Sequence, residues 1–223
     1  MLELDNPFWS SLATRHRSIA LRAGDAARYP PAYAPFLGVE HSGRADAALE
    51  HLVEPGESVY LLGMAPDAPA GWTQETFSPL AQMTCDERIE VIDGPEAIAL
   101  SSVHRDDVLA LTARVYPHYF RPRTMELGRY FGIYRDGRLA AMIGERLGTD
   151  THQEISAICT DPAHTGRGYA RRLLALLTND NLERGRTPVL HVSRANARAL
   201  ALYERIGYRV RREIGFWSLT RPG

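Results

Sequence analysis

The stretch I-S-A-I-C-T-D-P-A-H-T-G-R-G-Y-A-R-R-L-L-A-L-L, residues 155–177, decides how the rest of the chain is interpreted. Its first part predicts a strand over Gln153–Thr160, and its last part has apolar residues at the spacing of one helical face. Gly166 and Gly168 stand between the two, directly before the helix. Small residues there leave backbone N–H groups accessible, and the helix dipole points its positive end at the same place. The stretch therefore predicts an anion cradle over residues 165–170.

Length, charge and cysteine content exclude several classes of protein. The chain has 223 residues, 44% of them hydrophobic, with a formal net charge of −1, which gives no bias toward nucleic acid or an anionic membrane. Two distant cysteines, Cys85 and Cys159, make neither a disulfide framework nor a zinc motif. Glu3 and Asp5 argue against a signal peptide, and no window approaches the length of a transmembrane helix. We therefore expect a cytoplasmic protein without a metal, a nucleic-acid partner or a membrane partner.

From about residue 95 the predicted elements follow one another regularly. Asp136-Gly137 between two apolar runs predicts a hairpin turn, and Gly185 and Gly207 predict the ends of two helices. The expected elements are a helix over Asp106–Tyr116, strands over Gly128–Tyr134, Arg138–Leu147 and Gln153–Thr160, the helix ending near Gly185, a strand over Pro188–Ser193, a helix over Asn196–Ile206 and a strand or hairpin over Tyr208–Leu219. This order predicts an α/β fold in which helices flank a mixed, mostly antiparallel sheet.

Residues 1–95 contain no catalytic motif. The predicted elements are a short helix around Phe8, Trp9, Leu12 and Ala13, a helix over Ala45–Val53, and strands over Ser58–Leu62 and Glu87–Asp93, while Thr76–Thr84 fits a strand or a helix. We therefore expect an accessory region over residues 1–95 and a main domain over residues 96–223. The accessory region either completes the fold or is a partial copy of the same α/β unit.

Two blocks of the sequence resemble the signatures of the GNAT superfamily of N-acetyltransferases. The run T-D-P-A-H-T-G-R-G-Y-A-R-R-L-L is similar to the family's acyl-CoA-binding motif, and L-H-V-S-R-A-N-A-R-A-L-A-L-Y-E-R-I-G-Y is similar to its second motif. One helix and one strand separate the blocks, as in the family. The likeness covers residues from about 97 to the end and is closest to glycine N-acyltransferase-like C-terminal domains. It departs from the family at Thr165, where Arg or Gln is usual, and mildly at Thr160.

The resemblance implies where acetyl-CoA, or another acyl-CoA, would bind. The strand through Ile158, Cys159 and Thr160 would splay from its neighbour, pair with the pantetheine arm and aim an N–H near Ile158 at the thioester oxygen. The residues expected to hold the pyrophosphate are Thr165, Gly166, Arg167, Gly168, Tyr169 and Ala170. Asn196 suits a helix N-cap and, by the resemblance, a contact near the pantetheine. Cys159 alternates away from the Ile158 face, so its thiol is expected in the core rather than as a nucleophile.

Acyl transfer to an amine needs a proton acceptor and a proton donor. By the resemblance, Tyr203 is the general acid, and the phenol pKa near 10 suits protonation of a thiolate; by residue type alone it would be a core tyrosine. By the resemblance, the general base is Glu154, which opens the strand beside the cofactor, with Glu145 on the preceding strand as its competitor. By residue type alone, either would be a solvated charge at a strand edge. His164 and His191 are more typical of structural or surface histidines.

The acceptor is the open question. The expected partner is a small-molecule amine or a peptide N-terminus, with a homodimer as one assembly. Tyr116, His118, Tyr119 and Phe120, with Trp9 and Trp72, supply aromatic residues for an acceptor site, although ordinary packing would also explain them. The alternative to an enzyme is a non-catalytic acyl-CoA-binding or regulatory module, which the departure at Thr165 and the unassigned residues 1–95 keep open.

Overall fold

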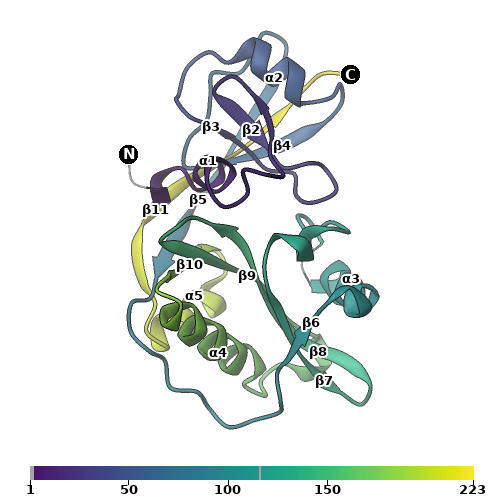
Figure 1. Cartoon of the computed structure of the whole chain (residues 1–223), viewed down its shortest axis with the longest axis vertical. Helices are drawn as coiled ribbons and strands as arrows, with labels where there is room; N and C mark the ends of the chain where they lie inside the picture. Colours follow the sequence, from purple (N-terminus) through teal and green to yellow (C-terminus); the bar gives the residue numbers. More distant parts are fainter. Residues whose placement is uncertain (1–2, 116) are drawn as a thin grey trace.

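A computed structural model describes residues 3–115 and 117–223, and its centre is an eight-stranded sheet (Figure 1). The strand order is β4-β11-β5-β10-β9-β8-β7-β6. The strands are β4 (Ser58–Leu62), β5 (Thr73–Thr84), β6 (Ile98–Leu100), β7 (Tyr130–Arg135), β8 (Arg138–Gly148), β9 (His152–Thr160), β10 (Thr187–Ser193) and β11 (Arg209–Thr220). Among these, β9 and β10 pair in parallel and the other neighbours pair antiparallel. The predicted mixed, mostly antiparallel sheet is therefore confirmed.

The parallel pair opens soon after it begins. Thr187–Val189 of β10 faces His152–Glu154 of β9, and beyond this point the two strands have no further register. One edge of residues 155–160 therefore lies without a strand partner on the β10 side, although β8 continues to pair with the other edge. A gap of this kind leaves backbone N–H and C=O groups available to a ligand.

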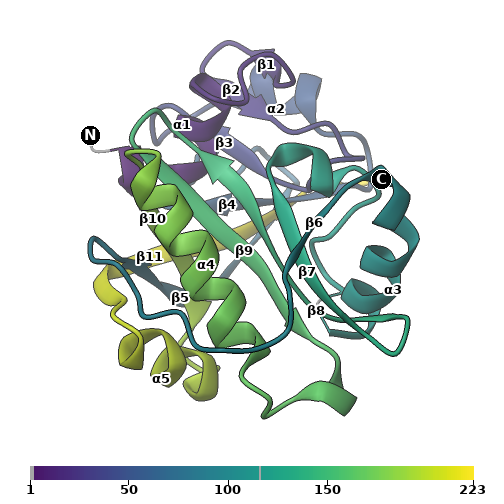
Figure 2. The ribbon, with the colours of Figure 1, turned by 60° about the horizontal axis from the view of Figure 1, so that its bottom comes forward.

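Helices cover both faces of the sheet. In Figure 2, α4 (Tyr169–Glu183) crosses β9 on one face and α3 (Arg105–Val115) lies to the other side. The α4 face holds a core with Ile143, Ile155 and Leu174, to which α5 (Ala197–Arg205) adds Tyr203. The α3 face holds a second core with Val108 and Cys159. Ile158 packs against the first core and the next residue, Cys159, lies in the second, as the alternation of a strand requires.

The N-terminal part joins the large sheet and adds a small one. Its elements are α1 (Pro7–Ala13), β1 (Leu21–Ala23), β2 (Ala26–Arg28), β3 (Leu37–Val39) and α2 (Asp46–Leu52), and the first three strands form a separate antiparallel sheet. The strands β4 and β5 belong to the eight-stranded sheet, where β5 lies between β10 and β11. The division at residue 95 stays a prediction, and the strand order shows that the sheet crosses it.

Single turns of 3₁₀ helix complete the chain. They are η1 (Glu3–Asp5), η2 (Ser102–His104), η3 (Thr124–Leu127) and η4 (Pro162–His164). The predicted hairpin turn is confirmed: Asp136 and Gly137 both have positive φ, 50° and 73°, between β7 and β8. Gly185 likewise has φ of 71° directly after α4, which ends where the sequence predicted.

Most predicted elements are present, and Thr76–Thr84, left open between strand and helix, lies in strand β5. The strand predicted over Glu87–Asp93 is wrong, because this segment has no regular structure. Its buried residue Ile89 instead pairs with the Asn179 side chain of α4, which accepts from the Ile89 N–H and donates to its carbonyl, both at 2.8 Å. The Asn179 side chain thus makes the backbone hydrogen bonds that a neighbouring strand would otherwise make. Four three-residue strands, β1, β2, β3 and β6, were not predicted, since three residues are too few to show alternation.

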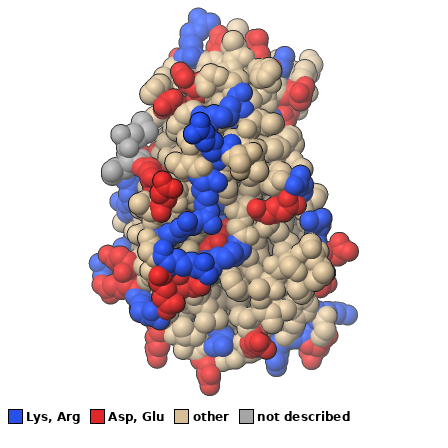
Figure 3. Space-filling view, viewed as in Figure 1, with Lys and Arg blue, Asp and Glu red and all other residues tan. Residues whose placement is uncertain are grey.

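The end of the predicted helix at Tyr116 lies outside the described residues. Within the part of the chain that the structure describes, no helix has the length and hydropathy needed to cross a bilayer. Over residues 3–115 and 117–223, no three His, Cys, Asp or Glu side chains gather as metal ligands would. On the face in Figure 3, basic side chains form a stripe with acidic side chains on both sides.

Candidate functional site

Two cavities meet at the open edge of β9. The first, of about 380 Å³, lies in the gap between β9 and β10 and extends to α1 and the N-terminal strands. The second, of about 510 Å³, runs along the glycine turn and α5. Ile158, Asn196 and Tyr203 line both cavities, so these residues mark the junction.

The glycine turn forms the end of the second cavity. Gly166 and Gly168 have φ of 79° and 78°, and a Cβ at Gly166 would meet nothing within 4 Å. Because Gly168 precedes α4 without a side-chain cap, the first-turn N–H groups of α4 lack both an intrahelical and a capping partner. Residues 165–170, predicted as an anion cradle, all line this cavity. The local geometry is that of a helix N-terminus open to an anion.

Thr165 stabilises the turn from within. Its hydroxyl donates to the Pro162 carbonyl at 3.1 Å, and its backbone N–H points to the same oxygen at 3.5 Å. Asp161 begins this turn by accepting the Ala163 N–H at 2.9 Å. Thr165 therefore braces the cradle through backbone contacts and adds no charge to it. The Tyr169 side chain is buried in the α4 core and stacks near His164, so this residue offers the cavity its backbone.

Three arginines near the cradle differ in their contacts. Arg167 and Arg171 line the second cavity. Arg172 turns away and donates to the carbonyl oxygens of Pro95 and Ile92, at 2.8 and 2.5 Å. Arg172 therefore fastens the irregular segment before β6 onto α4, whereas the other two place positive charge beside the cradle.

A bulge shapes the open edge of β9. Ala157 has φ of 50°, which is left-handed and uncommon for a residue with a Cβ, and the pairing with β8 shifts register between Met142 and Gly144. Ile158 and Thr160 are partly exposed and line the second cavity. Cys159 is 1% exposed in the α3 core, and burial raises the pKa of its thiol to about 12. The thiol therefore lies in the core, although Cys159 is also one of the residues that line the first cavity.

The helix α5 carries the other two residues at the junction. Asn196 is its N-cap, as predicted, and the Asn196 Oδ1 atom accepts the Ala199 N–H at 3.2 Å. Tyr203 is 8% exposed, so most of its ring lies in the core beside Tyr208 and the rest faces the cavities. The cap fixes the start of the helix whose second turn positions the phenol.

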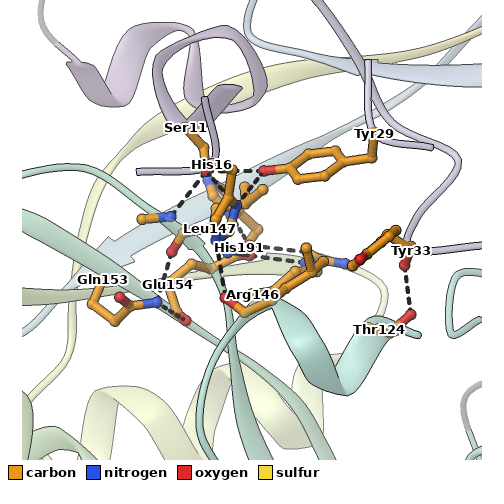
Figure 4. A network of polar contacts seen from close by, with 12 residues as sticks. Ser11, His16, Tyr29, Tyr33, Thr124, Arg146, Leu147, Gln153, Glu154 and His191 are labelled. Carbon is orange, nitrogen blue, oxygen red and sulfur yellow. Dashed lines mark hydrogen bonds and ion pairs between the residues drawn. The ribbon is translucent and has the colours of Figure 1, made fainter. Parts of the chain in front are cut away.

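Glu154 lies at the floor of the first cavity, in the polar network of Figure 4. Arg146 holds both of its oxygens, each at 2.9 Å, and the Leu147 N–H points to one of them at 3.3 Å. His191 contacts the same carboxylate through Nδ1 at 2.8 Å. Burial alone would raise the pKa of Glu154, but the Arg146 charge and these hydrogen bonds outweigh it and hold the pKa at about 2. The carboxylate is therefore buried and ionised.

Glu145, the competing candidate, lies away from both cavities. It is also 1% exposed and pairs with an arginine, Arg129, which reaches it by both its guanidinium and its backbone N–H. Arg129 is more exposed than Arg146 and also pairs with Asp180, and of the two carboxylates only Glu154 borders the described cavities.

The far wall of the first cavity comes largely from the N-terminal region. Phe8 stacks on Phe36 at 4.4 Å, and Tyr119 contacts Phe36 and Phe216 at 6.0 and 6.2 Å between ring centres. Leu62 and Leu80 complete this wall. Of the aromatic residues predicted for an acceptor site, Tyr119 lines the cavity, while His118, Phe120, Trp9 and Trp72 do not, and Tyr116 lies outside the described residues. Residues 1–95 therefore help build the site.

The sequence pattern does not predict several residues that line the first cavity, among them His191, Arg146 and Phe216. His191 was treated as structural, although its side chain is 3% exposed and lies between Glu154 and Gln82, whose Nε2 is 3.0 Å from His191 Nε2. Arg146 and Phe216 were not considered at all. The positions of these three depend on the strand register between distant parts of the chain, and no local pattern signals it.

Comparisons with known proteins show what the whole chain is similar to. The model of a family described as FR47-like protein matches residues 130–217. A structure described as an acetyltransferase of the GNAT family, from Novosphingobium aromaticivorans DSM 12444, is 31% identical over 100% of both chains, with a TM-score of 0.87. No curated protein matches the sequence.

More distant structures share the fold. A GCN5-related N-acetyltransferase from Kribbella flavida has a TM-score of 0.63 at 19% identity, with 96% of this chain and 93% of that chain covered. A GCN5-related N-acetyltransferase-like protein from Streptococcus suis 89/1591 has a TM-score of 0.58 at 16% identity, covering 95% and 92%. The 31% identity over the full length of the Novosphingobium structure shows the family: the chain belongs to the GNAT family of acetyltransferases.

Proposed function

We propose that the protein is an acyl-CoA-dependent N-acyltransferase that moves the acetyl group of acetyl-CoA to a primary amine by direct attack in a ternary complex. The observation that carries the proposal is the meeting of two cavities at Ile158, Asn196 and Tyr203. One cavity ends in an anion cradle, and the other contains a buried carboxylate beside a histidine. A donor and an acceptor can thus approach one point from opposite sides.

The second cavity fits the CoA moiety. Backbone N–H groups at residues 166–170 and the arginines Arg167 and Arg171 suit a pyrophosphate, and the open edge of β9 suits the amide groups of pantetheine. When bound, the donor supplies an acyl thioester. The proposal extends to other acyl-CoA donors, which the sequence likeness to glycine N-acyltransferase-like domains favours.

Transfer requires that a C–N bond forms as the C–S bond breaks, that the amine loses one proton and that the sulfur gains one. We assign the donation of a proton to Tyr203, which lies at the junction of the cavities. We assign the acceptance of the amine proton to the Glu154–His191 pair. Because Arg146 keeps Glu154 ionised, the carboxylate can neutralise the charge that an imidazolium would acquire.

The direct test is thiol release from acetyl-CoA with a panel of amines and peptide N-termini. This sequence contains no lysine, so all 26 of its Lys and Arg positions are arginine and no lysine side chain of the protein competes as an acceptor. Release above hydrolysis with at least one amine is expected. Stabilisation by acetyl-CoA without release for any acceptor would instead favour an acyl-CoA-binding module. A cytoplasmic location and a homodimer stay predictions from the sequence.

A further inference from the structure

The first cavity has a wall that is apolar almost throughout. Six apolar or aromatic residues that pack in one cluster line this wall: Phe8, Phe36, Leu62, Leu80, Tyr119 and Phe216. Phe8 and Phe36 are each 2% exposed, so their rings are fixed by packing before any ligand arrives. A volume of about 380 Å³ is large enough for a ring or a short alkyl chain in addition to the reacting groups.

The charges in this cavity already compensate one another. Among the described residues that line it, the arginine and acidic side chains are Arg146 and Glu154, and these two bind each other through two hydrogen bonds of 2.9 Å. The Arg146 guanidinium also lies over the Phe36 ring, 4.8 Å from its centre. An acceptor with a carboxylate or a second ammonium group would therefore bury a charge against rings and leucines, without a matching opposite charge.

The acceptor, rather than a long acyl chain, suits this cavity because of what lies at its floor. An acyl chain is apolar and has no proton to give up. If an acyl chain filled the cavity, the Glu154–His191 pair would face hydrocarbon and would have no proton to accept. The carboxylate and the imidazole of this pair are 2.8 Å apart. An amine attacking at the junction brings the proton for which this pair is placed.

We propose, resting on the acyltransferase function above, that the acceptor is a primary amine carried on an aromatic or similarly bulky apolar body without a carboxylate or a second amine. The aromatic wall packs against that body, and its nitrogen lies toward Glu154 and His191. The N-terminal region, through Phe8, Phe36, Leu62 and Leu80, is thereby the part of the chain that selects the acceptor.

Matched pairs of amines test this selection. Phenethylamine is compared with phenylalanine, and hexylamine with 1,6-diaminohexane, because each pair differs by one charged group. We expect kcat/KM to be at least about 100-fold higher for the singly charged member of each pair, the effect of burying an unpaired charge. Calorimetry of the same amines with the protein in the presence of CoA, which cannot acylate them, should show the same order of affinities.

A charge introduced into the wall should change the preference. Leu80, half-buried on β5, is replaced in the variant Leu80→Arg, which offers a carboxylate a partner inside the cavity. The ratio of kcat/KM for phenethylamine to kcat/KM for phenylalanine should fall at least about tenfold relative to the wild type. The shift in melting temperature caused by acetyl-CoA should stay as in the wild type. Val103→Arg, at a position 83% exposed and outside both cavities, is the control and should leave the ratio unchanged.

The outcomes separate the two proposals. If acetyl-CoA neither stabilises the protein nor releases thiol with any amine, the acyltransferase function itself fails. If transfer occurs but the doubly charged or carboxylate-bearing amines react as well as their partners, the proposed acceptor class is wrong. Faster transfer from phenylacetyl-CoA than from acetyl-CoA, with no discrimination among amines, would assign the apolar wall to the acyl group and overturn the proposal as well.

Discussion

Glu154 and Glu145 are each 1% exposed and each pairs with an arginine, but only Glu154 borders a cavity, so Glu145 serves as the control position for mutation of Glu154. Replacing Glu154 by Gln removes the carboxylate that pairs with Arg146, whose side chain is 11% exposed, whereas Glu145→Gln leaves Arg129, 29% exposed, in its second ion pair with Asp180. Glu154→Gln should lower the free energy of unfolding by about 3 to 5 kcal/mol, and Glu145→Gln by less, as measured by urea titration. Only Glu154→Gln should also lower kcat for amine acetylation at a temperature where both variants are folded. Equal kcat losses in the two would contradict a role for Glu154 in the reaction.

The carboxylate of Glu154 also predicts a pH dependence of stability. Its pKa is near 2 in the folded protein against an ordinary value of 4.5, so the unfolded chain binds a proton first as the pH falls. The stabilisation is therefore complete above about pH 4.5 and is lost as the pH falls toward 2. Urea unfolding of the wild type and of Glu154→Gln should show that the difference between their free energies of unfolding becomes smaller as the pH falls over this range. A constant difference would mean that Glu154 is protonated, or equally paired, in both states.

Tyr203 and Tyr208 allow the proton donor to be tested against a neighbouring phenol. Their rings lie 6.2 Å apart, but the Tyr208 hydroxyl bonds Thr178 in the core at 2.8 Å and lines neither cavity. Tyr203→Phe should lower kcat about 100-fold or more, while acetyl-CoA still shifts the melting temperature. Tyr208→Phe should cost about 1 kcal/mol of stability and keep its activity. Full activity in Tyr203→Phe would rule out this phenol as the donor.

The turn before α4 combines glycines at positive φ with an open space. Gly166→Asp should abolish the acetyl-CoA thermal shift, because it places a negative charge where the pyrophosphate would lie. Gly137→Asp is its control, since Gly137 has φ of 73° and equal space around its Cβ, but lies in the β7–β8 hairpin. Both variants carry similar backbone strain. Unchanged binding in Gly166→Asp would refute the cradle.

The elements around the cradle were readable in the sequence because their signals are local. Glycines at positive φ, an Asn at a helix start and apolar residues at helical spacing act within a few residues of each other, and Gly166, Gly168 and Asn196 all lie where they were expected. The segment over residues 87–93 alternates like a strand, yet Asn179, about ninety residues away, satisfies its backbone. Local alternation cannot distinguish a strand from an extended segment held by a side chain.

The residues that line the first cavity could not be predicted from local sequence signals in the same way. Phe8 and Phe36 line the same cavity as Glu154 although more than a hundred residues separate them along the chain, and the register that brings His191 beside Glu154 is set by a short parallel pairing. The family resemblance predicted Glu154 at the start of its strand, whereas its partner Arg146 follows from contacts between β8 and β9. Contacts between residues that are far apart along the chain produce no periodic pattern in the sequence from which they could be predicted.

At the scale of the whole molecule, β5 ties the two parts of the chain together. It pairs with β10 over five positions and with β11 along most of its length, so its removal would expose an edge of each. We predict that a fragment of residues 96–223 does not fold alone. Circular dichroism of the fragment should show no cooperative thermal transition, whereas the fragment mixed with a separate 1–95 chain should regain one. A cooperative transition in the isolated fragment would support an independent domain.

The place of β11 between β4 and β5 has a consequence for the order of events during synthesis. Residues 209–220 are the central neighbour of two strands that leave the ribosome more than a hundred residues earlier. Until that last strand arrives, β4 and β5 have no permanent partner on the sides where β11 will insert, and unpaired strand edges invite aggregation. Folding of this chain should thus complete late and in a single concerted step, with slow kinetics typical of long-range contacts.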